Sequence, residues 1–493
     1  MTLFIYDDLD KTKREFRPLN PPKVLMYVCG PTVYDYCHLG HAKSYVSFDV
    51  VRKYMEYFKK FDVKYVQNFT DIDDKIIRRA NEIGDDPFKL AEKFTKEYFI
   101  DAEELGIKRA DSYPQVTLHI QEIIEFTKKL IETGFAYADG KGNVYYDVSK
   151  FPTYGKLSNF NPDESRQNQK IPVEESGKDD PLDFALWKAA KAEEPSWESP
   201  WGAGRPGWHI ECSAMSVKHL GEQIDIHGGG MDLCFPHHEN EIAQSEAYNG
   251  GKRFAQFWMH NGFIIIKGEK MSKSLGNFFT IKDLLKKYDA KTIRYFLVST
   301  HYKSPVDYGE EELVRAEASR KRIQNCYDAL KKCSGDGEAS GGPDDSKLID
   351  ACGMARTDFE NAMDDDFNTP LAMRAVFDLV SVSNKAIDSG IRGKKLAKVV
   401  ETLEEFDKVL GILSEPVEFN DEVQGAIDEL IAERDEARKN KDWKRSDSIR
   451  AGLGGLGITV EDSKDGTRSN WKLQPGREMP STEDVRTARE KLN

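Results

Sequence analysis

The sequence predicts an α/β protein whose amino-terminal part is built around a sheet and whose carboxyl-terminal part is helical. Three observations predict this class. Strand-like and helix-like runs alternate from residue 23 to about residue 120, which is the pattern of a βαβ unit. A second series of such runs begins at about residue 207. From Glu310 onward the pattern is helical.

The opening βαβ pattern contains two apolar runs, at 24–28 and 63–69, that are typical of strands. A helix is expected between them, after His41, because apolar side chains recur there at helical spacing: Phe48, Val51, Met55 and Phe58. The segment 37–41 therefore lies at a strand-to-helix turn. Such a turn offers an anion unpaired backbone N–H groups and the positive end of the helix dipole.

An insertion is expected between two halves of one sheet. From about 118 to 201 the pattern changes to a helix followed by short alternating segments such as 143–148, and then to a polar stretch at 161–180 to which no role is assigned. The second half of the sheet resumes with 207–215, a strand at 223–227 and a helix at 236–248.

The remaining segments are predominantly helical. The run 281–300 has a helical pattern, as do 348–413 and a final unit at 417–471. The small and acidic residues of 334–345 predict a loop. The last twenty or so residues are polar, and we expect them to be poorly ordered.

Composition restricts the class of protein further. A chain of 493 residues predicts three or four domains, and no apolar run approaches the ~18 residues that a membrane span needs. The amino terminus carries no export signal. Seven cysteines, an odd and scattered set, indicate a reducing compartment, so we expect the cytosol. The net charge of −14 means that a nucleic-acid partner must be bound by local basic patches.

Two distant segments carry side chains that handle phosphate. In 37–41, Gly40 permits the close approach of a nucleotide, and His38 and His41 supply hydrogen-bond donors. In 270–274, Lys270 and Lys273 can meet the charge that builds on departing pyrophosphate. Either segment alone has an ordinary alternative, a turn with satisfied histidines or a solvated loop. Their conjunction predicts activation of a substrate by ATP.

These segments resemble the HIGH and KMSKS signatures of class I aminoacyl-tRNA synthetases. Within that class the chain resembles the cysteinyl-tRNA synthetases almost end to end, as far as Trp471. The stretches that carry this resemblance are 26–35, 68–75, 207–213, 235–241 and 362–370.

The resemblance implies a Rossmann-type parallel-sheet catalytic domain split by an insertion, then a helical bundle and a small α+β or helical domain. The implied domains are a first catalytic half (1–117), a connective insertion (118–201), a second catalytic half (202–262), a region with the lysine loop (263–310), a helical bundle (311–415) and an anticodon-recognition domain with a polar tail (416–493). The implied reaction joins L-cysteine to tRNA(Cys) through cysteinyl-adenylate, with Mg²⁺ accompanying ATP and no membrane involved.

The resemblance also implies one Zn²⁺ per subunit, held by Cys29, Cys212, His237 and Glu241. Such an ion would favour the thiol of cysteine over the hydroxyl of serine. Spacing alone supports the site only weakly. His237 and Glu241 stand at i, i+4 on one helix face, but Cys234 and His237 have a C-x-x-H spacing that zinc sites also use. We expect Cys29 and Cys212 to be ligands because they fall in the matched motifs, and Cys234 to pack nearby.

Further residues receive roles from the same resemblance. Thr70, Trp208 and Asp232 would line the amino-acid pocket, with the carboxylate of Asp232 suited to the substrate ammonium. Gly229 and Gly230 would lie under the adenosine end of ATP. An equally good alternative is that Trp208 is buried in the hydrophobic core and has no role in substrate binding.

For RNA binding, the basic segment 438–445 contains Trp443, which could stack on an unpaired base. Composition favours the alternative, a solvated helix face with Trp443 packed inward. Two other functions stay open from the sequence alone. One is a ligase that transfers cysteine to a sugar amine, and the other is a catalytically silent RNA-binding paralogue.

Overall fold

The computed structural model describes residues 2–162, 164, 177–266, 268–271, 278–334, 344–414, 421–462, 469–473 and 480–492. The chain divides into two compact units, residues 1–413 and residues 414–493. Each unit is described by itself.

A four-stranded parallel sheet forms the centre of the first unit, in the order β10-β9-β3-β4. Its strands are β3 (Lys23–Val28), β4 (Asp62–Gln67), β9 (Ile224–Gly230) and β10 (Ala255–Asn261). Most of their residues are buried, as expected for a parallel sheet that is covered on both faces. The sheet confirms the predicted α/β class and joins strands from both predicted halves. Ligands of such sheets bind at the carboxyl ends of the strands.

Helix α1 (Leu39–Tyr57) connects β3 to β4. Of its predicted apolar face, Phe48, Val51 and Met55 are buried in the core, while Phe58 is the C-cap residue and is partly buried. The chain then forms α2 (Asp74–Ile83) and α3 (Pro87–Glu104) before it enters the insertion. Two further helices flank the strands of the second half, α7 (Trp208–Leu220) and α8 (Glu239–Tyr248).

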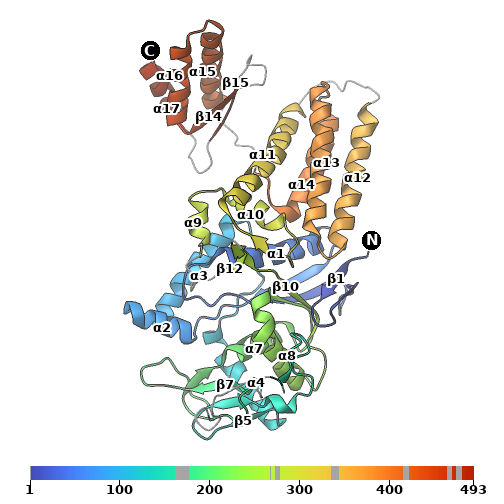
Figure 1. Ribbon diagram of the computed structural model, residues 1–493, viewed down its shortest axis with the longest axis vertical. Helices are drawn as coiled ribbons and strands as arrows, with labels where there is room; N and C mark the ends of the chain where they lie inside the picture. Colours follow the sequence, from blue (N-terminus) through green and yellow to red (C-terminus); the bar gives the residue numbers. More distant parts are fainter. Residues whose placement is uncertain are drawn as a thin grey trace. The chain divides into compact units, whose positions relative to one another are not determined.

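The insertion has its own antiparallel sheet, and its apolar residues form one cluster with residues of α2, α7 and α8. Its elements are η1 (Val116–Leu118), α4 (Ile120–Glu132), β5 (Ala136–Ala138), β6 (Val144–Tyr146), η2 (Val148–Lys150), β7 (Phe184–Ala189) and β8 (Gly204–Pro206). Figure 1 shows β5, β7 and α4 together, in green and cyan. Most of the polar stretch 161–180 lies outside the described residues.

Short elements surround the central sheet. β1 (Phe4–Asp7) and β2 (Thr12–Glu15) form a hairpin, and β11 (Ile264–Ile266) pairs with β12 (Glu269–Lys270) and β13 (Val306–Asp307). The predicted helical run 281–300 contains α9 (Ile281–Leu285) and α10 (Ala290–Val298).

A helical bundle completes the first unit, as predicted. Its helices are α11 (Glu310–Cys333), α12 (Asp344–Asp364), α13 (Thr369–Asp388) and α14 (Lys394–Leu410), which lie side by side in Figure 1. Buried Arg294 ties α10 to this bundle and to α1. Its guanidinium donates to the carbonyl of Leu410 and to the carboxylate of Asp49. The predicted loop 334–345 lies largely outside the described residues.

The second unit is an α+β domain of α15 (Asp421–Lys439), α16 (Trp443–Gly455), a hairpin of β14 (Ile458–Asp462) and β15 (Ser469–Leu473), and α17 (Thr482–Leu492). The expected disorder of the chain's end is wrong for 482–492, because α17 buries Val485 and pairs Arg489 with Glu429 at 2.6 Å. An inward-packed Trp443 is also wrong, because this side chain is 58% exposed. None of the described helices has the length and apolarity to cross a bilayer.

Candidate active site and metal centre

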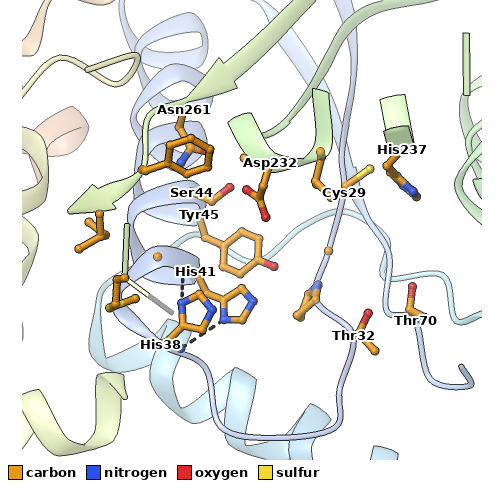
Figure 2. A pocket seen from close by; sticks show the side chains of 18 of the residues that line it. Cys29, Thr32, His38, His41, Ser44, Tyr45, Thr70, Asp232, His237 and Asn261 are labelled. Carbon is orange, nitrogen blue, oxygen red and sulfur yellow. Dashed lines mark hydrogen bonds between the residues drawn. The ribbon is translucent and has the colours of Figure 1, made fainter. Parts of the chain in front are cut away.

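A cavity of about 290 Å³ opens beside the carboxyl ends of β3, β9 and β10. Figure 2 shows the residues around it, with His38 and His41 apart from Cys29 and His237. The predicted site residues that line it are Cys29, His38, Gly40, His41, Thr70, Trp208, Cys212, Gly230, Asp232, His237 and Lys270. Sequence segments from both halves of the sheet domain therefore meet around one space.

The two histidines of the first signature hold each other in place. His38 is the N-cap of α1, and its Nδ1 accepts a hydrogen bond from the backbone N–H of His41 at 3.2 Å. The Nδ1 of His41 accepts from the backbone N–H of His38 at the same distance. Because both Nδ1 atoms accept, each neutral ring carries its proton on Nε2, which is a donor suited to a phosphate oxygen. The rings stack with centroids 3.8 Å apart.

Gly40 makes this arrangement possible. A Cβ at this position would lie 2.8 Å from Cε1 and 2.9 Å from Nδ1 of His38. The structure thus adds a second reason for glycine here, beside the predicted approach of a nucleotide.

The chain that follows the lysine loop is tied directly to the histidine turn. The backbone N–H of Leu39 donates to the carbonyl of Phe279 at 3.1 Å, and Ile281 donates to Cys37 at 2.9 Å. Lys270 is exposed, with its ammonium 4.0 Å from the centre of the Phe263 ring. Lys273 lies outside the described residues.

Four donor atoms converge at the other part of the site. The Sγ of Cys29 lies 3.8 Å from the Sγ of Cys212 and 3.4 Å from Oε1 of Glu241, and the Nε2 of His237 lies 3.0 Å from that oxygen. Cys29 follows β3, Cys212 is on α7, His237 is in the turn η4 (Cys234–His238) and Glu241 is in α8. All four are buried, and their ligand atoms lie within 4.8 Å of one another.

The ionisable groups of this cluster hold a positive charge among them, which is a proton on His237 until a metal ion displaces it. The hydrogen bond with Cys29 lowers the pKa of Cys212 to about 6 although burial opposes ionisation. Burial also opposes the charge of His237, but Glu241 and Cys212 raise its pKa to about 10. Among the described residues, buried Oε2 of Glu241 has no hydrogen-bond partner, and the Nε2 of His227 lies 3.5 Å from it. Two sulfurs, an imidazole and a carboxylate with an unsatisfied oxygen have the chemistry of a metal site.

Sequence reasoning missed two histidines beside this cluster. His227 and His238 form a second group with Cys29 and Glu241, in which Nε2 of His238 lies 3.3 Å from the Sγ of Cys29. From the sequence, His227 is only the end of the predicted strand at 223–227, and His238 is only part of the matched stretch 235–241. Cys234, the alternative ligand, belongs to neither of these groups of described residues.

The predicted amino-acid pocket lies next to the cluster. The Trp208 ring is 4.5 Å from the His237 ring, and the hydroxyl of Thr70 donates to buried Glu211 at 3.2 Å. Asp232 follows β9 in η3 (Met231–Leu233) and lines the cavity. Gly229 is not among the described lining residues, and a Cβ at this position would meet His238 and Leu233.

Comparisons with known proteins agree across the chain. Residues 15–318 match the model of the class I (C) tRNA synthetase catalytic domain, 358–414 match the DALR domain, and 420–468 match the cysteinyl-tRNA ligase anticodon binding domain.

Two curated relatives are the cysteine–tRNA ligases of Carboxydothermus hydrogenoformans and Pyrococcus horikoshii. The first is 50% identical and the match covers 95% of this chain and 99% of that protein. The second is 50% identical and the match covers 96% and 99%.

Among solved structures, Mycobacterium tuberculosis methionyl-tRNA synthetase in complex with methionyl-adenylate is similar with a TM-score of 0.57 at 16% identity. The match covers 79% of this chain and 90% of that one. The ternary complex of Agrobacterium radiobacter K84 agnB2 LeuRS, tRNA and LeuAMS has a TM-score of 0.57 at 10% identity, covering 80% and 85%. These two matches support the fold.

Proposed function

Because the chain belongs to the family of cysteine–tRNA ligases, we propose that Cys29, Cys212, His237 and Glu241 hold one zinc ion that selects cysteine by its thiol. The chain is an aminoacyl-tRNA synthetase that joins L-cysteine to tRNA(Cys) at the expense of ATP. The two alternative functions, a ligase that transfers cysteine to a sugar amine and a catalytically silent RNA-binding paralogue, are therefore no longer supported. Location in the cytosol stays a prediction from the cysteine pattern.

One observation carries the zinc proposal. Four separate segments of the chain bring two sulfurs, an imidazole nitrogen and a carboxylate oxygen within 4.8 Å of one another in a buried cluster, of which Cys29, Cys212 and His237 line the cavity. Zinc in proteins is held by this kind of donor set. When bound, the ion would favour a thiolate strongly over a neutral hydroxyl, so that serine is rejected at the binding step.

The remaining pocket residues would orient the amino acid. The ring of Trp208 packs against the ring of His237 and would form a wall beside the substrate side chain. The carboxylate of Asp232 would accept hydrogen bonds from the substrate ammonium, while Thr70 stays fixed through its bond to Glu211. The substrate carboxylate would then point toward the histidine turn, where its attack on the α-phosphorus of ATP gives cysteinyl-adenylate and pyrophosphate.

The histidine turn and the lysine loop would act on the phosphates. His38 and His41 donate from Nε2, since their Nδ1 atoms are occupied. Gly40 and Gly230 line the cavity and would leave room for the nucleotide. Lys270 and Lys273 would neutralise the departing pyrophosphate, together with Mg²⁺ that arrives with ATP.

Two cysteine variants test the ligand assignment. Cys212→Ser is expected to lose bound zinc, because the variant lacks one of two sulfur donors. Cys234→Ser serves as the matched control and should retain the zinc content of the natural protein. Elemental analysis of both proteins decides the matter, since zinc lost from Cys234→Ser and kept by Cys212→Ser would reverse the assignment.

A further inference from the structure

Lys75 is a basic side chain at the cavity to which the activation reaction assigns no role. It is the second residue of α2, it is exposed, and it lines the cavity. Its ammonium lies 5.8 Å from the ring centre of Tyr34 and 5.8 Å from that of Trp208. Because Trp208 contacts the ring of His237, Lys75 lies at the metal-cluster end of the cavity.

The carboxylates that precede Lys75 are already engaged. Asp73 caps α2 by accepting from the backbone N–H of Ile76 at 2.8 Å. Asp74 forms ion pairs with Lys188, at 2.7 Å, and with Arg205. Asp73 interacts with Lys75 through its charge, but no carboxylate of the described residues forms an ion pair with Lys75. The two rings hold the ammonium by cation–π attraction and leave it able to bind an anion.

The position of Lys75 restricts which anion it meets. Among the described residues that line the cavity, the lysines are Lys75 and Lys270, and no arginine lines it. Lys270 begins the loop that serves pyrophosphate. A cysteine whose sulfur faces the metal cluster must direct its carboxylate toward the histidine turn, and therefore away from Trp208 and Lys75.

The remaining anionic substrate is the single-stranded 3′ end of tRNA. Its terminal ribose must enter the cavity to accept the cysteine, and its phosphates must then cross the rim. We propose that Lys75 binds a phosphate of this 3′ end and positions the terminal ribose for transfer. This inference rests on the proposed placement of cysteine, with its sulfur at Cys29 and Cys212.

Three variants on one helix test the proposal: Lys75→Met, its rescue Lys75→Arg, and the control Arg78→Met. Lys75→Met removes the ammonium and keeps an apolar stem against the rings. Arg78→Met removes a positive charge from an exposed residue about one turn further along α2 that is not among the described lining residues. Cysteine-dependent ATP–pyrophosphate exchange without tRNA measures activation, and single-turnover transfer from preformed cysteinyl-adenylate measures the second step.

For Lys75→Met we expect exchange to stay within about twofold, while transfer at subsaturating tRNA slows by about tenfold. The slope of log affinity for tRNA against log salt should fall by about 0.7, the value for one phosphate contact on a single strand. Lys75→Arg should restore most of the transfer rate, because it returns the charge. Arg78→Met should change neither step.

Transfer that is unchanged in Lys75→Met overturns the inference. So does a rise in the KM for cysteine in exchange that accounts for the whole loss, since Lys75 would then act on the amino acid. Failure of the natural protein to prefer cysteine over serine in exchange would instead refute the proposed selection by zinc. Retained exchange also shows that the variant is folded.

Discussion

The substitution Gly40→Ala separates the geometry of the histidine turn from the stability of the fold. The new Cβ would lie 2.8 Å from Cε1 of His38 and 2.9 Å from its Nδ1, closer than real Cβ atoms approach their neighbours. The ring of His38 must therefore move. Its Nδ1 would then lose the hydrogen bond from the backbone N–H of His41, which is one half of the reciprocal pair.

The effects on stability nearly cancel. Replacing glycine by alanine within a helix gains up to about 1 kcal/mol, and losing an N-cap side-chain bond costs typically about 1 kcal/mol. The free energy of unfolding in urea should thus change by less than about 1 kcal/mol. Catalysis should suffer far more, because a displacement of about 1 Å in a positioning group can cost on the order of 10²-fold in rate.

The assay is cysteine-dependent ATP–pyrophosphate exchange, measured beside urea unfolding. Gly353→Ala is the control, because Gly353 lies in α12 and a Cβ there meets nothing within 4 Å. It should stabilise the protein by up to about 1 kcal/mol and leave exchange unchanged. The reasoning is refuted if Gly40→Ala exchanges within about twofold of the natural protein, or if it loses several kcal/mol of stability.

Three further predictions concern the wider fold. Arg294→Met leaves buried Asp49 with Lys53 as its remaining ion-pair partner and with the hydrogen bond from the backbone N–H of Lys108. It should cost about 3 kcal/mol in urea unfolding, and a loss under about 1 kcal/mol would contradict the role of the Arg294–Asp49 ion pair. Burial lowers the pKa of Lys43 to about 7 in the folded protein. Between pH 7 and about 10.5, Lys43 therefore binds more protons in the unfolded chain than in the folded one. Its contribution to the free energy of unfolding should rise with pH over this range. Lys43→Met should remove this contribution. The prediction is wrong if the free energy of unfolding changes with pH at the same slope in the variant and in the natural protein. Trp443→Ala should change stability by less than about 0.5 kcal/mol but weaken tRNA binding by about 1–3 kcal/mol, and unaltered binding would exclude stacking.

Local pattern predicted the elements that carry the site. Strand β3 is predictable from the apolar run 24–28, and helix α1 from the helical spacing of Phe48, Val51 and Met55. Both patterns are present because these elements bury those residues in the core. The lysine loop illustrates a limit of another kind. Its sequence is recognisable, but Lys273 lies outside the described residues, so its role rests on the resemblance alone.

Contacts between distant segments could not be predicted from local pattern. His227 approaches Cys29 because β9 pairs in parallel with β3, a register that no sequence spacing reveals. The polar composition of segment 482–492 predicts a disordered tail. The segment instead forms α17, which is stabilised by the burial of Val485 and by the ion pair of Arg489 with Glu429. Composition likewise placed Trp443 inward, although it stands exposed at the start of α16.

Calorimetric binding of cysteine and of serine to the zinc-loaded and the zinc-stripped protein tests the central claim most directly. Zinc content would be verified by elemental analysis in each preparation. We expect the loaded protein to bind cysteine more tightly than serine by orders of magnitude, and the stripped protein to lose this preference. A verified zinc-free protein that discriminates cysteine from serine as well as the loaded one would contradict selection by a metal at Cys29, Cys212, His237 and Glu241.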